Sequence, residues 1–486
     1  MVGAQLSYKV LPCLTLSGRV RFDDSYTKAT DKRYAGTLGN LSDNSERGYY
    51  GETNYKEKQI FADFLASFNK DFSEDWNLQA NFGGSINDMR YESTDIRGGI
   101  PDGSENYPGQ DALLTNFFSI NNISRNAPKT WNMWREQTQS IYASADLGYK
   151  RTYYLTLTGR NDWPSALAGV NSKKSSFFYP SVGISVLMTQ LFEDAGLNIP
   201  SEYLSFWKIR ASWASVGTAF PRYIANPRYE WVNGTWSVLT QYPVNNLLPE
   251  RTKSWEVGMN FRFLKDFNFD ATWYQADTYN QTFNPNVPVG KYSKIYVQTG
   301  KIRNWGMEFA LGFDHTWNNF SWASNMTYSF NKNVIKELGR NAYNPVTGEK
   351  LDIDQLVMTD NQVGATRFIL REGGTMGDLY SMVDLQRDHN GNIYINPEGN
   401  VSTVSVADKP IKLGSVLPKG NLAWSNSFTW KNLTASFMLS ARFGGVVYSR
   451  TQAVLDYYGV SEATGQARDR GFVSINNGDG INPEQW

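Results

Sequence analysis

Pairs of strand-like segments with alternating apolar and polar residues recur along the chain, and a short turn joins the two members of each pair. In the clearest pair, Trp255–Phe263 alternates Trp, Val, Met and Phe with polar residues, and Phe267–Trp273 repeats the pattern after a turn. Because successive side chains of a strand point to opposite faces, each strand has one apolar and one polar face. Such strands, repeated around a closed sheet, predict a membrane barrel with lipid outside and water or a polar plug inside.

Seven such pairs predict about fourteen antiparallel strands in up-and-down order, and the fold class is therefore all-β. The predicted pairs are Leu6–Val10 with Leu14–Phe22, Ile60–Asn69 with Trp76–Ile86, Ile141–Tyr149 with Tyr153–Arg160, Phe178–Met188 with Phe206–Val216, Trp255–Phe263 with Phe267–Trp273, Trp305–Phe313 with Phe320–Phe330, and Leu422–Trp430 with Leu433–Arg442. Almost no long helix is expected. A short helical turn is predicted before Pro200, in the connection Thr189–Ser205.

Long polar connections follow the pairs, almost always at the same end. They are Asp23–Lys58, Asn87–Gln139, Asn161–Phe177, Gly217–Lys253, Ala276–Arg303 and Asn331–Gly420. In a compact soluble domain, structureless loops of this length would count against the strand assignment. A soluble propeller or sandwich would have short turns at both ends of its strands. Short turns at one end and long loops at the other are typical of a barrel in the outer membrane of a Gram-negative cell.

Composition agrees with this interpretation and narrows the chemistry. The chain is 41% hydrophobic and 15% aromatic with a mean hydropathy of −0.48, and it has no uninterrupted apolar run of the roughly 18 residues that a membrane helix needs. Equal numbers of basic and acidic residues, 47 each, give no indication of a nucleic-acid partner. A single cysteine, Cys13, excludes an internal disulfide and a cysteine metal cluster. Two histidines, His315 and His389, argue against a histidine-rich metal site, so no metal or cofactor is predicted.

Motifs for catalysis are absent or weak, and the chain is predicted not to be an enzyme and to have no catalytic residues. In Asp388–Asn392 the glycine comes too early for a calcium loop, and a glycine turn is the better interpretation. The acidic residues Asp456, Glu462 and Asp469 are expected to be solvated charges in loops rather than a glycosidase pair. The sequence has no G-x-S-x-G motif and no phosphate-binding glycine loop.

Aromatic residues fall into two classes. Rings within the predicted strands are expected to face lipid or to form the girdles at the membrane interfaces. Rings in the predicted loops are candidates for substrate or partner contacts, because a flat ring beside polar groups suits the apolar face of a sugar. These candidates are Trp131, Trp134, Trp231, Trp236 and Tyr242. The alternative for each is that it packs against its own loop.

Six groups of residues, in order along the chain, resemble segments of SusC/RagA-type TonB-linked outer-membrane proteins. They are Gly159–Asp162 with Phe177–Gly183, Trp207–Gly217, Leu248–Gly258, Gly300–Glu308, Phe330–Val334, and Leu413–Lys419 with Phe443–Gly445. Each group falls on a predicted strand or turn.

The resemblance implies a fold and a function. Members of this family are plugged barrels of 22 strands, so the chain would supply about fourteen strands of the larger barrel. They import nutrients, usually oligosaccharides and sometimes peptides, with a SusD-like lipoprotein as a lid and with the TonB energy-transducing complex pulling an N-terminal segment. The alternative is a non-transporting surface glycan-binding β protein whose loops form the binding face. The loop sequences do not reveal the substrate.

Residues 1–486 differ from the family pattern at both ends. Met1–Leu6 leads directly into strand-like sequence, without a signal peptide, TonB box or plug domain. The last residues, from Asn476 to Trp486, are expected to form a loop rather than a closing strand, because Pro483 and an Asn/Gly run interrupt them. The whole chain is therefore interpreted as a partial barrel domain without its plug, which alone would leave sheet edges that lipid does not tolerate.

Overall fold

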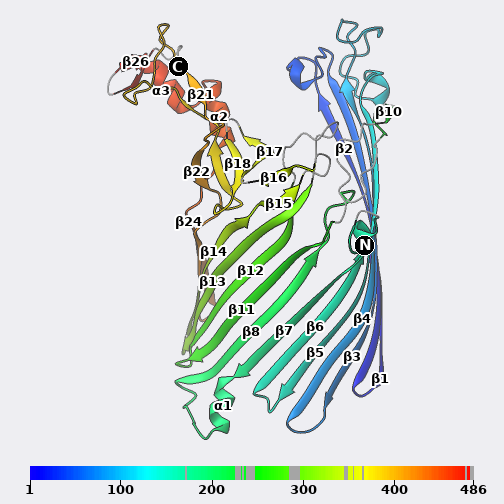
Figure 1. Ribbon diagram of the computed structural model, residues 1–486, viewed down its shortest axis with the longest axis vertical. Helices are drawn as coiled ribbons and strands as arrows, with labels where there is room; N and C mark the ends of the chain where they lie inside the picture. The colour runs from blue at the N-terminus through cyan, green and yellow to red at the C-terminus, as the bar shows by residue number, and fades with distance from the viewer. Residues whose placement is uncertain are drawn as a thin grey trace. The chain divides into compact units, whose positions relative to one another are not determined.

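The computed structural model describes residues 1–169, 172–224, 231–232, 235–236, 247–283, 296–343, 348–353, 355–363, 366–476 and 479–481. The chain forms two compact units. The first comprises Met1–Leu187, Ser212–Arg251 and Val287–Tyr296, and the second comprises Met188–Ala211, Thr252–Asn286 and Val297–Trp486. Figure 1 shows the chain coloured from its N-terminus to its C-terminus.

One large sheet contains fourteen main strands, with hydrogen-bonded order β1-β2-β3-β4-β5-β6-β7-β8-β11-β12-β13-β14-β23-β24. This confirms the predicted up-and-down order and all seven predicted pairs. In this order β1 and β24 each have one neighbour. The strands are β1 Val2–Leu11, β2 Leu14–Arg33, β3 Tyr49–Asp71, β4 Trp76–Gly99, β5 Lys129–Tyr149, β6 Tyr153–Pro164, β7 Phe177–Leu187, β8 Leu204–Thr218, β11 Glu250–Phe263, β12 Phe267–Phe283, β13 Val297–Trp317, β14 Phe320–Glu337, β23 Gly420–Trp430 and β24 Leu433–Phe443.

Many strands extend well beyond their predicted ends. β2 continues to Arg33 and pairs with β3 from Leu14 onward without a register shift, and β4 and β5 likewise extend to Gly99 and from Lys129. Figure 1 shows β3, β4 and β5 side by side along their length. Large parts of the predicted loops Asp23–Lys58 and Asn87–Gln139 are therefore strand, and those predictions are wrong. The extensions carry polar residues on both faces, so they lack the alternation of apolar and polar residues by which strands are recognised in a sequence. The hydrogen bonds between the strand backbones form without that alternation.

Tight turns join the strands at the end opposite the long connections. Lys150 and Arg151, between β5 and β6, have φ values of 50° and 53°. Two consecutive positive φ angles are the geometry of a hairpin turn whose twist matches that of the strands. The longer connection between β7 and β8 contains α1, Met188–Asp194, which confirms the predicted helical turn.

In the first unit, adjacent rows across the sheet have opposite character. Register pairs place one apolar row across β2 to β7, namely Leu14, Phe68, Ala80, Ala145, Leu157 and Val182. The next row is entirely polar, namely Thr15, Ser67, Asn81, Ser144, Thr158 and Ser181. We call the two sides the apolar face and the polar face. Large side chains on the apolar face, such as Phe64 and Phe82, are exposed, as expected of residues whose solvent is lipid.

The second unit repeats this arrangement. A row on its apolar face consists of Phe269, Leu311, Met326, Trp424 and Leu439, and the neighbouring row on its polar face consists of Asp270, Ala310, Thr327, Ala423 and Ser440. Met326 and Leu439 are 42% and 57% exposed. An exposed apolar surface of this extent is the mark of a membrane or partner contact rather than of a water-facing surface.

The connection between β14 and β23 is folded, although the sequence predicted one long loop. It contains a two-stranded sheet, a four-stranded sheet and a further strand pair, built from β15 Gly339–Tyr343, β16 Lys350–Ile353, β17 Gln355–Val363, β18 Thr366–Arg371, β19 Asp378–Ser381, β20 Val383–Leu385, β21 Thr403–Ser405 and β22 Ile411–Ser415. Figure 1 shows them beyond the ends of β13 and β14. A buried core joins them to those strands through Ile302, Ile335, Leu338, Ile353, Leu356 and Leu370.

After β24 the chain forms α2 Arg450–Tyr457, α3 Glu462–Arg470 and a hairpin of β25 Val473–Ile475 with β26 Asp479–Ile481. The prediction of loop structure throughout the last residues is therefore wrong at β26. It rested on the Asn/Gly-rich sequence, of which Asp479 and Gly480 lie in β26 and pair with β25. Among the described residues, the helices are too short or too polar to cross a membrane.

The face assignment predicts opposite effects at two adjacent exposed positions of β14. Met326→Arg should hinder insertion by roughly 2–4 kcal/mol, because it places a charge on the lipid-facing side near the middle of the apolar rows. Thr327→Arg, on the polar face, should be tolerated. Folding titrations into lipid vesicles measure both. A larger cost for Thr327→Arg would mean that the faces are assigned backwards.

Candidate functional site

Two of the predicted loop tryptophans, Trp131 and Trp134, lie on strand β5. Trp131 pairs with Thr94 and Trp134 with Tyr91 of β4. The prediction that both rings occupy a loop is therefore wrong, because the polar sequence around them hid the strand. Their odd separation places them on opposite faces, with Trp134 on the polar face and Trp131 on the side of the apolar face. Their contact with a substrate or partner stays a prediction.

Trp134 is the centre of an aromatic cluster on the polar face. Its ring stacks on Tyr91 with centroids 5.4 Å apart, and Tyr91 in turn lies 6.4 Å from Tyr55 of β3. The Cζ atom of Arg222, from the segment after β8, lies 3.8 Å from the Trp134 ring centroid. Arg222 Nη1 donates a hydrogen bond to Glu136 Oε2 at 2.5 Å. The rings of Tyr55, Tyr91 and Trp134 therefore form a strip across β3, β4 and β5, and the guanidinium group of Arg222 lies against the Trp134 ring.

Trp131 lies on the other side of β5 and is 54% exposed. Its indole Nε1 donates a hydrogen bond to Glu92 Oε1 at 3.2 Å. Beside it, Thr130 pairs with Val232 of β9 (Trp231–Val232), which forms a hairpin with β10 (Thr235–Trp236). Trp236 is 66% exposed, and the Trp231 backbone pairs with it. Backbone segments that carry four of the predicted residues therefore meet at one end of β5, whereas Tyr242 lies outside the described residues.

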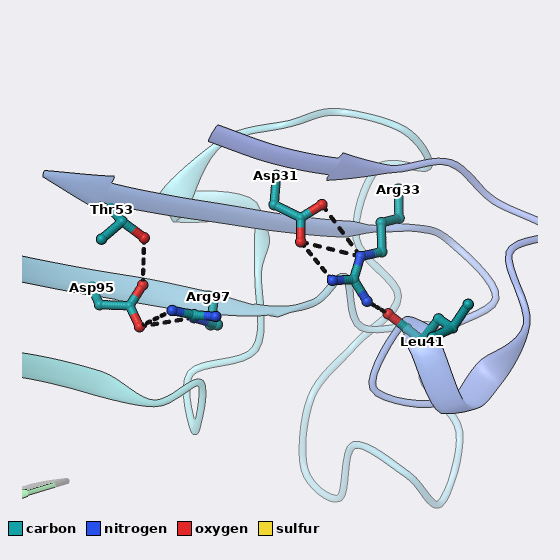
Figure 2. Close-up of polar contacts among 6 residues, drawn as sticks. All are labelled: Asp31, Arg33, Leu41, Thr53, Asp95 and Arg97. Atoms are coloured by element: carbon teal, nitrogen blue, oxygen red, sulfur yellow. Dashed lines mark hydrogen bonds and ion pairs between the residues drawn. The ribbon is translucent and has the colours of Figure 1, made fainter. Parts of the chain in front are cut away.

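A second cluster lies on the polar face at the loop end of β2, β3 and β4, and Figure 2 shows it. The Asp31 carboxylate accepts hydrogen bonds from Arg33 Nε and from Arg33 Nη2, the latter at 2.6 Å. Two strands away, Asp95 accepts one from Thr53 Oγ1 at 2.7 Å and one from Arg97 Nε at 2.8 Å. Two acid–base pairs thus stand side by side on one surface.

Gly51 lies between these two pairs, opposite Asp31 on one side and Arg97 on the other. A Cβ atom at this position would lie 3.1 Å from Arg97 Cβ and 3.5 Å from Asp31 Cβ, so a side chain here would crowd both pairs. The guanidinium carbon of Arg33 lies 4.6 Å from the Tyr49 ring centroid. Burial and the nearby Asp43 raise the pKa of the Tyr49 phenol, and the arginines offset this only in part. Tyr49 therefore keeps its proton.

The arrangement suits recognition of polar, uncharged or zwitterionic groups. Arg97 is 52% exposed and Arg33 is 35% exposed, so both can donate further hydrogen bonds. Their partner carboxylates accept hydrogen bonds, and the rings of the Trp134 cluster offer apolar surface. Hydroxyl and amide groups beside apolar patches match this combination of donors, acceptors and rings.

Reasoning from aromatic residues missed these arginines, although the sequence contains a signal for them. Acidic and basic residues recur two positions apart, a spacing that puts both side chains on the same face of a strand. The pairs with this spacing that form ion pairs are Arg21–Asp23, Asp31–Arg33, Asp88–Arg90, Asp95–Arg97 and Arg160–Asp162. Arg222 gives no such signal, because its contacts with Trp134 and Glu136 form only in the folded chain.

In the second unit, Arg210 of β8 organises the polar face of β11 and β12. Its Nη1 donates to Asn260 Oδ1 at 2.6 Å and its Nη2 donates to Thr272 Oγ1 at 2.5 Å, while both lie 3.2 Å from the Asp270 carboxylate. A Cβ atom on Gly258 would lie 2.7 Å from Arg210 Cζ, so glycine leaves the space that the guanidinium fills. The guanidinium N–H groups of Arg210 thus bond to side chains within the sheet, and these contacts hold β8, β11 and β12 together.

The folded connection contains a buried ion pair that ties β19 to β22. Asp378 is 1% exposed, and its carboxylate accepts hydrogen bonds from Lys412 Nζ at 2.5 Å and from Thr375 Oγ1 at 2.7 Å. Burial raises the pKa of Asp378, but the hydrogen bonds from Lys412 and Thr375 outweigh it, so the pKa lies below its usual value. The charged carboxylate therefore stabilises this sheet.

In the described part of the chain, no three His, Cys, Asp or Glu side chains gather in a way that could hold a metal ion. Asp388 Oδ1 accepts hydrogen bonds from the backbone N–H groups of Asn390 and Asn392, and Gly391 has a φ of 86°, which confirms the predicted glycine turn. The acidic residues predicted in loops lie instead on helices: Asp456 on α2, and Glu462 and Asp469 on α3.

The chain matches a protein-family model described as "TonB dependent receptor-like, beta-barrel" over residues 12–445. It is 27% identical over 369 residues to TonB-dependent receptor P26 of Formosa agariphila, a match that covers 68% of this chain and 34% of that protein. It is 24% identical over 340 residues to TonB-dependent receptor SusC of Bacteroides thetaiotaomicron, which covers 65% of this chain and 32% of that protein. The chain thus spans about a third of the length of these curated relatives.

Solved structures show the same fold. The RagAB peptide importer in its open-open state superposes with a TM-score of 0.68 at 15% identity, covering 91% of this chain and 46% of the compared chain. The RagAB peptide transporter gives a TM-score of 0.67 at 16% identity, covering 90% and 47%.

Because the lowered pKa of Asp378 belongs to the folded state, its stabilisation is present at neutral pH and is lost as the pH falls below the ordinary carboxyl value of 3.8. The protection factors of the amide hydrogens across Thr366–Ser381, which are corrected for the intrinsic pH dependence of exchange, should therefore fall on acidification. Asp378→Asn should lose about 1–3 kcal/mol of local stability at neutral pH and should respond little to acid. Equal, acid-insensitive protection in both proteins would show that the ion pair does not hold this sheet together.

Proposed function

Because the chain belongs to the TonB-dependent receptor β-barrel family, we propose that it is part of an outer-membrane transporter that imports oligosaccharides or peptides. The observation that supports this most is the family match over residues 12–445, on a sheet whose exposed apolar face suits lipid. Transport is proposed for the whole protein, since the chain spans about a third of the length of its curated relatives.

We propose three partners for the protein besides its substrate: the lipid of the outer membrane of a Gram-negative bacterium, a SusD-like surface lipoprotein, and the TonB energy-transducing complex. The relationship to SusC and the similarity in fold to the RagAB peptide importer support the second and third of these. In this proposal the long connections face the cell exterior and the tight turns face the periplasm.

The proposed substrate-contacting surface is the polar face of the first unit at its loop end. There the half-exposed guanidinium groups of Arg33 and Arg97 lie on the same face as the ring strip that contains Trp134. Sugar hydroxyls and peptide amides would both find donors and acceptors on this surface. Trp131 and Trp236, which are more exposed, are proposed to contact the substrate or the lipoprotein lid.

The family match favours transport over the alternative of a non-transporting surface glycan-binding protein. The alternative needs only exposed loops as a binding face. It gives no reason for two chemically distinct faces that persist across β2 to β7.

Uptake should depend on Arg97 but not on Arg90, which has the same Asp-x-Arg spacing on the opposite side of β4. We expect Arg97→Gln to weaken substrate uptake about tenfold, as for the loss of one charge-assisted hydrogen bond. Arg90→Gln serves as the matched control and should transport normally. Concentration-dependent uptake of labelled oligosaccharides and peptides by whole cells measures both. Equal uptake by the two variants would remove this surface from the transport path.

The proposed orientation is tested by epitope tags at two loops of the first unit. Gly109 lies in the connection between β4 and β5, has a φ of 71°, and has open space around it, so an insertion there should be tolerated. We expect antibody to reach a tag at Gly109 on intact cells and a tag at Ser73, in the β3–β4 turn, only after the outer membrane is opened. The reverse pattern would show that the topology is inverted.

A further inference from the structure

The apolar face of the first unit ends at a defined boundary on β3 and β4. On β4, every position of this face from Trp76 to Ile86 is apolar, and the next position is Asp88. On β3, Ile60 is the last apolar position of the same face, and the next position is Lys58. A change from apolar to charged side chains on a lipid-facing wall indicates the boundary between the hydrocarbon of the membrane and its headgroups.

The length of β4 agrees with that assignment. Trp76 begins the strand at the tight-turn end, and Asp88 lies twelve positions further along it. At roughly 3.3 Å per residue and a tilt of about 45°, this length spans roughly 28 Å across the membrane. The apolar band of an outer-membrane barrel is about 25 Å tall. Asp88 and the residues just beyond it therefore lie at the headgroup level of the leaflet on the side of the long connections.

At this level three basic residues form one row across three strands, which we call the basic row. Lys58 of β3 is the register partner of Arg90 of β4, and Arg90 is the register partner of Arg135 of β5. Each is an even number of positions along its strand from a member of the apolar row described above, so all three lie on the lipid-facing side. Like charges directly opposite each other on neighbouring strands destabilise a sheet. The basic row is therefore more stable with anions beside it.

Asp88 holds two of these side chains at one point. Its carboxylate accepts a hydrogen bond from Arg90 Nε at 3.1 Å and one from Arg135 Nε at 2.9 Å, and Arg135 Nη2 also donates to it. Gln137 Nε2 donates a further hydrogen bond to the same carboxylate at 2.9 Å. Asp88 is buried beneath these groups. The two guanidinium groups are therefore fixed beside each other on the lipid-facing side.

The basic row keeps donors and positive charge that the protein does not use. The side chains of Arg90 and Arg135 are each more than half exposed. Within the described part of the chain, both Nη atoms of Arg90 and the Nη1 atom of Arg135 donate no hydrogen bond. Lys58 Nζ lies 3.6 Å from an oxygen of Asp24, at the end of the row. The carboxylates of Asp88 and Asp24 offset two of the three positive charges, so one remains.

We propose that the basic row binds the phosphate group of a lipid headgroup in the outer leaflet. Guanidinium groups donate paired hydrogen bonds to phosphate, and lysine binds phosphate as a point charge. The phosphate lies over the guanidinium groups of Arg90 and Arg135 with Lys58 beside it, and the acyl chains lie along exposed rings of the apolar face such as Phe64 and Phe82. A lipid is favoured over a protein partner because the basic row directly borders the lipid-facing positions.

This inference goes beyond the proposed function and rests only on its placement of the strands in the outer membrane. The basic row lies on the opposite side of the sheet from the proposed substrate surface, so lipid binding and uptake are tested separately.

The experiment uses the whole protein, extracted from outer membranes in mild detergent and stripped of lipid. It is incubated with a diacyl phosphatidate, with the diacylglycerol that has the same chains, or with inorganic phosphate, and bound molecules are counted by native mass spectrometry. The test variant is Lys58→Gln with Arg135→Gln, in which Asp88 keeps its hydrogen bonds from Arg90 and Gln137.

The matched control is Lys9→Gln with Arg21→Gln, which removes the same two charges from the polar face. Lys9 of β1 pairs with Thr15 of the polar row, and Arg21 is an even number of positions from Thr15 along β2. Circular dichroism verifies that each variant keeps its sheet.

We expect the test variant to bind the phosphatidate at least about fivefold more weakly than the wild type and the control, a change of about 1 kcal/mol. The diacylglycerol should bind weakly to all three proteins. Retention of phosphatidate binding by the folded test variant would overturn the proposal, as would equal binding of the diacylglycerol or an equal loss in the control. Inorganic phosphate that displaces the phosphatidate at equal concentration would show a free-phosphate site and would also overturn it.

Discussion

Every backbone N–H and C=O group that spans the membrane needs a hydrogen-bond partner on a neighbouring strand, and the rest of the structure depends on this constraint. Lipid offers no hydrogen bonds, so a strand must satisfy its N–H and C=O groups through continuous ladders. The ladder between β3 and β4 runs from Tyr49 and Gly99 to Asp71 and Asn77 without a register shift. An unbroken register fixes which face each side chain occupies along the full strand. The apolar face, the polar face and the ion pairs all depend on this alternation of side chains between the two faces.

The sequence predicted the strands well where the two faces differ in polarity. Leu157 and Thr158 belong to rows of opposite character, and alternation of this kind located all fourteen strands. It failed where both faces are polar, as from Asp23 to Arg33, because hydrogen bonding alone continues the strand there. The fold of the connection after β14 was not predicted for another reason. Its core forms from Ile335, Ile353 and Leu370, which are far apart in sequence, so no local pattern indicates that they pack together.

Four of the aromatic residues singled out in the sequence belong to segments near one end of β5, but their pattern does not predict the charged groups around them. Trp131 and Trp134 lie on this strand rather than in the predicted loop, and they occupy opposite faces, so they do not form a single surface. The guanidinium groups that share the polar face with Trp134 have a sequence signature in the two-residue spacing of Asp95 and Arg97. Arg222 has none, because its place over the Trp134 ring depends on the path of the chain after β8.

The folded connection leaves the sheet from β14 and returns on β23, its direct neighbour. Pro418, three residues beyond the last register pair, lacks the N–H that would extend the ladder. The ends of the connection therefore stay together whatever lies between them, and the entropy of closing such a loop grows only slowly with its length. Evolution can replace, enlarge or shorten this segment without altering the lipid-facing wall. Divergence among relatives should therefore concentrate in this segment, as variation concentrates in the loops that other rigid scaffolds hold in place.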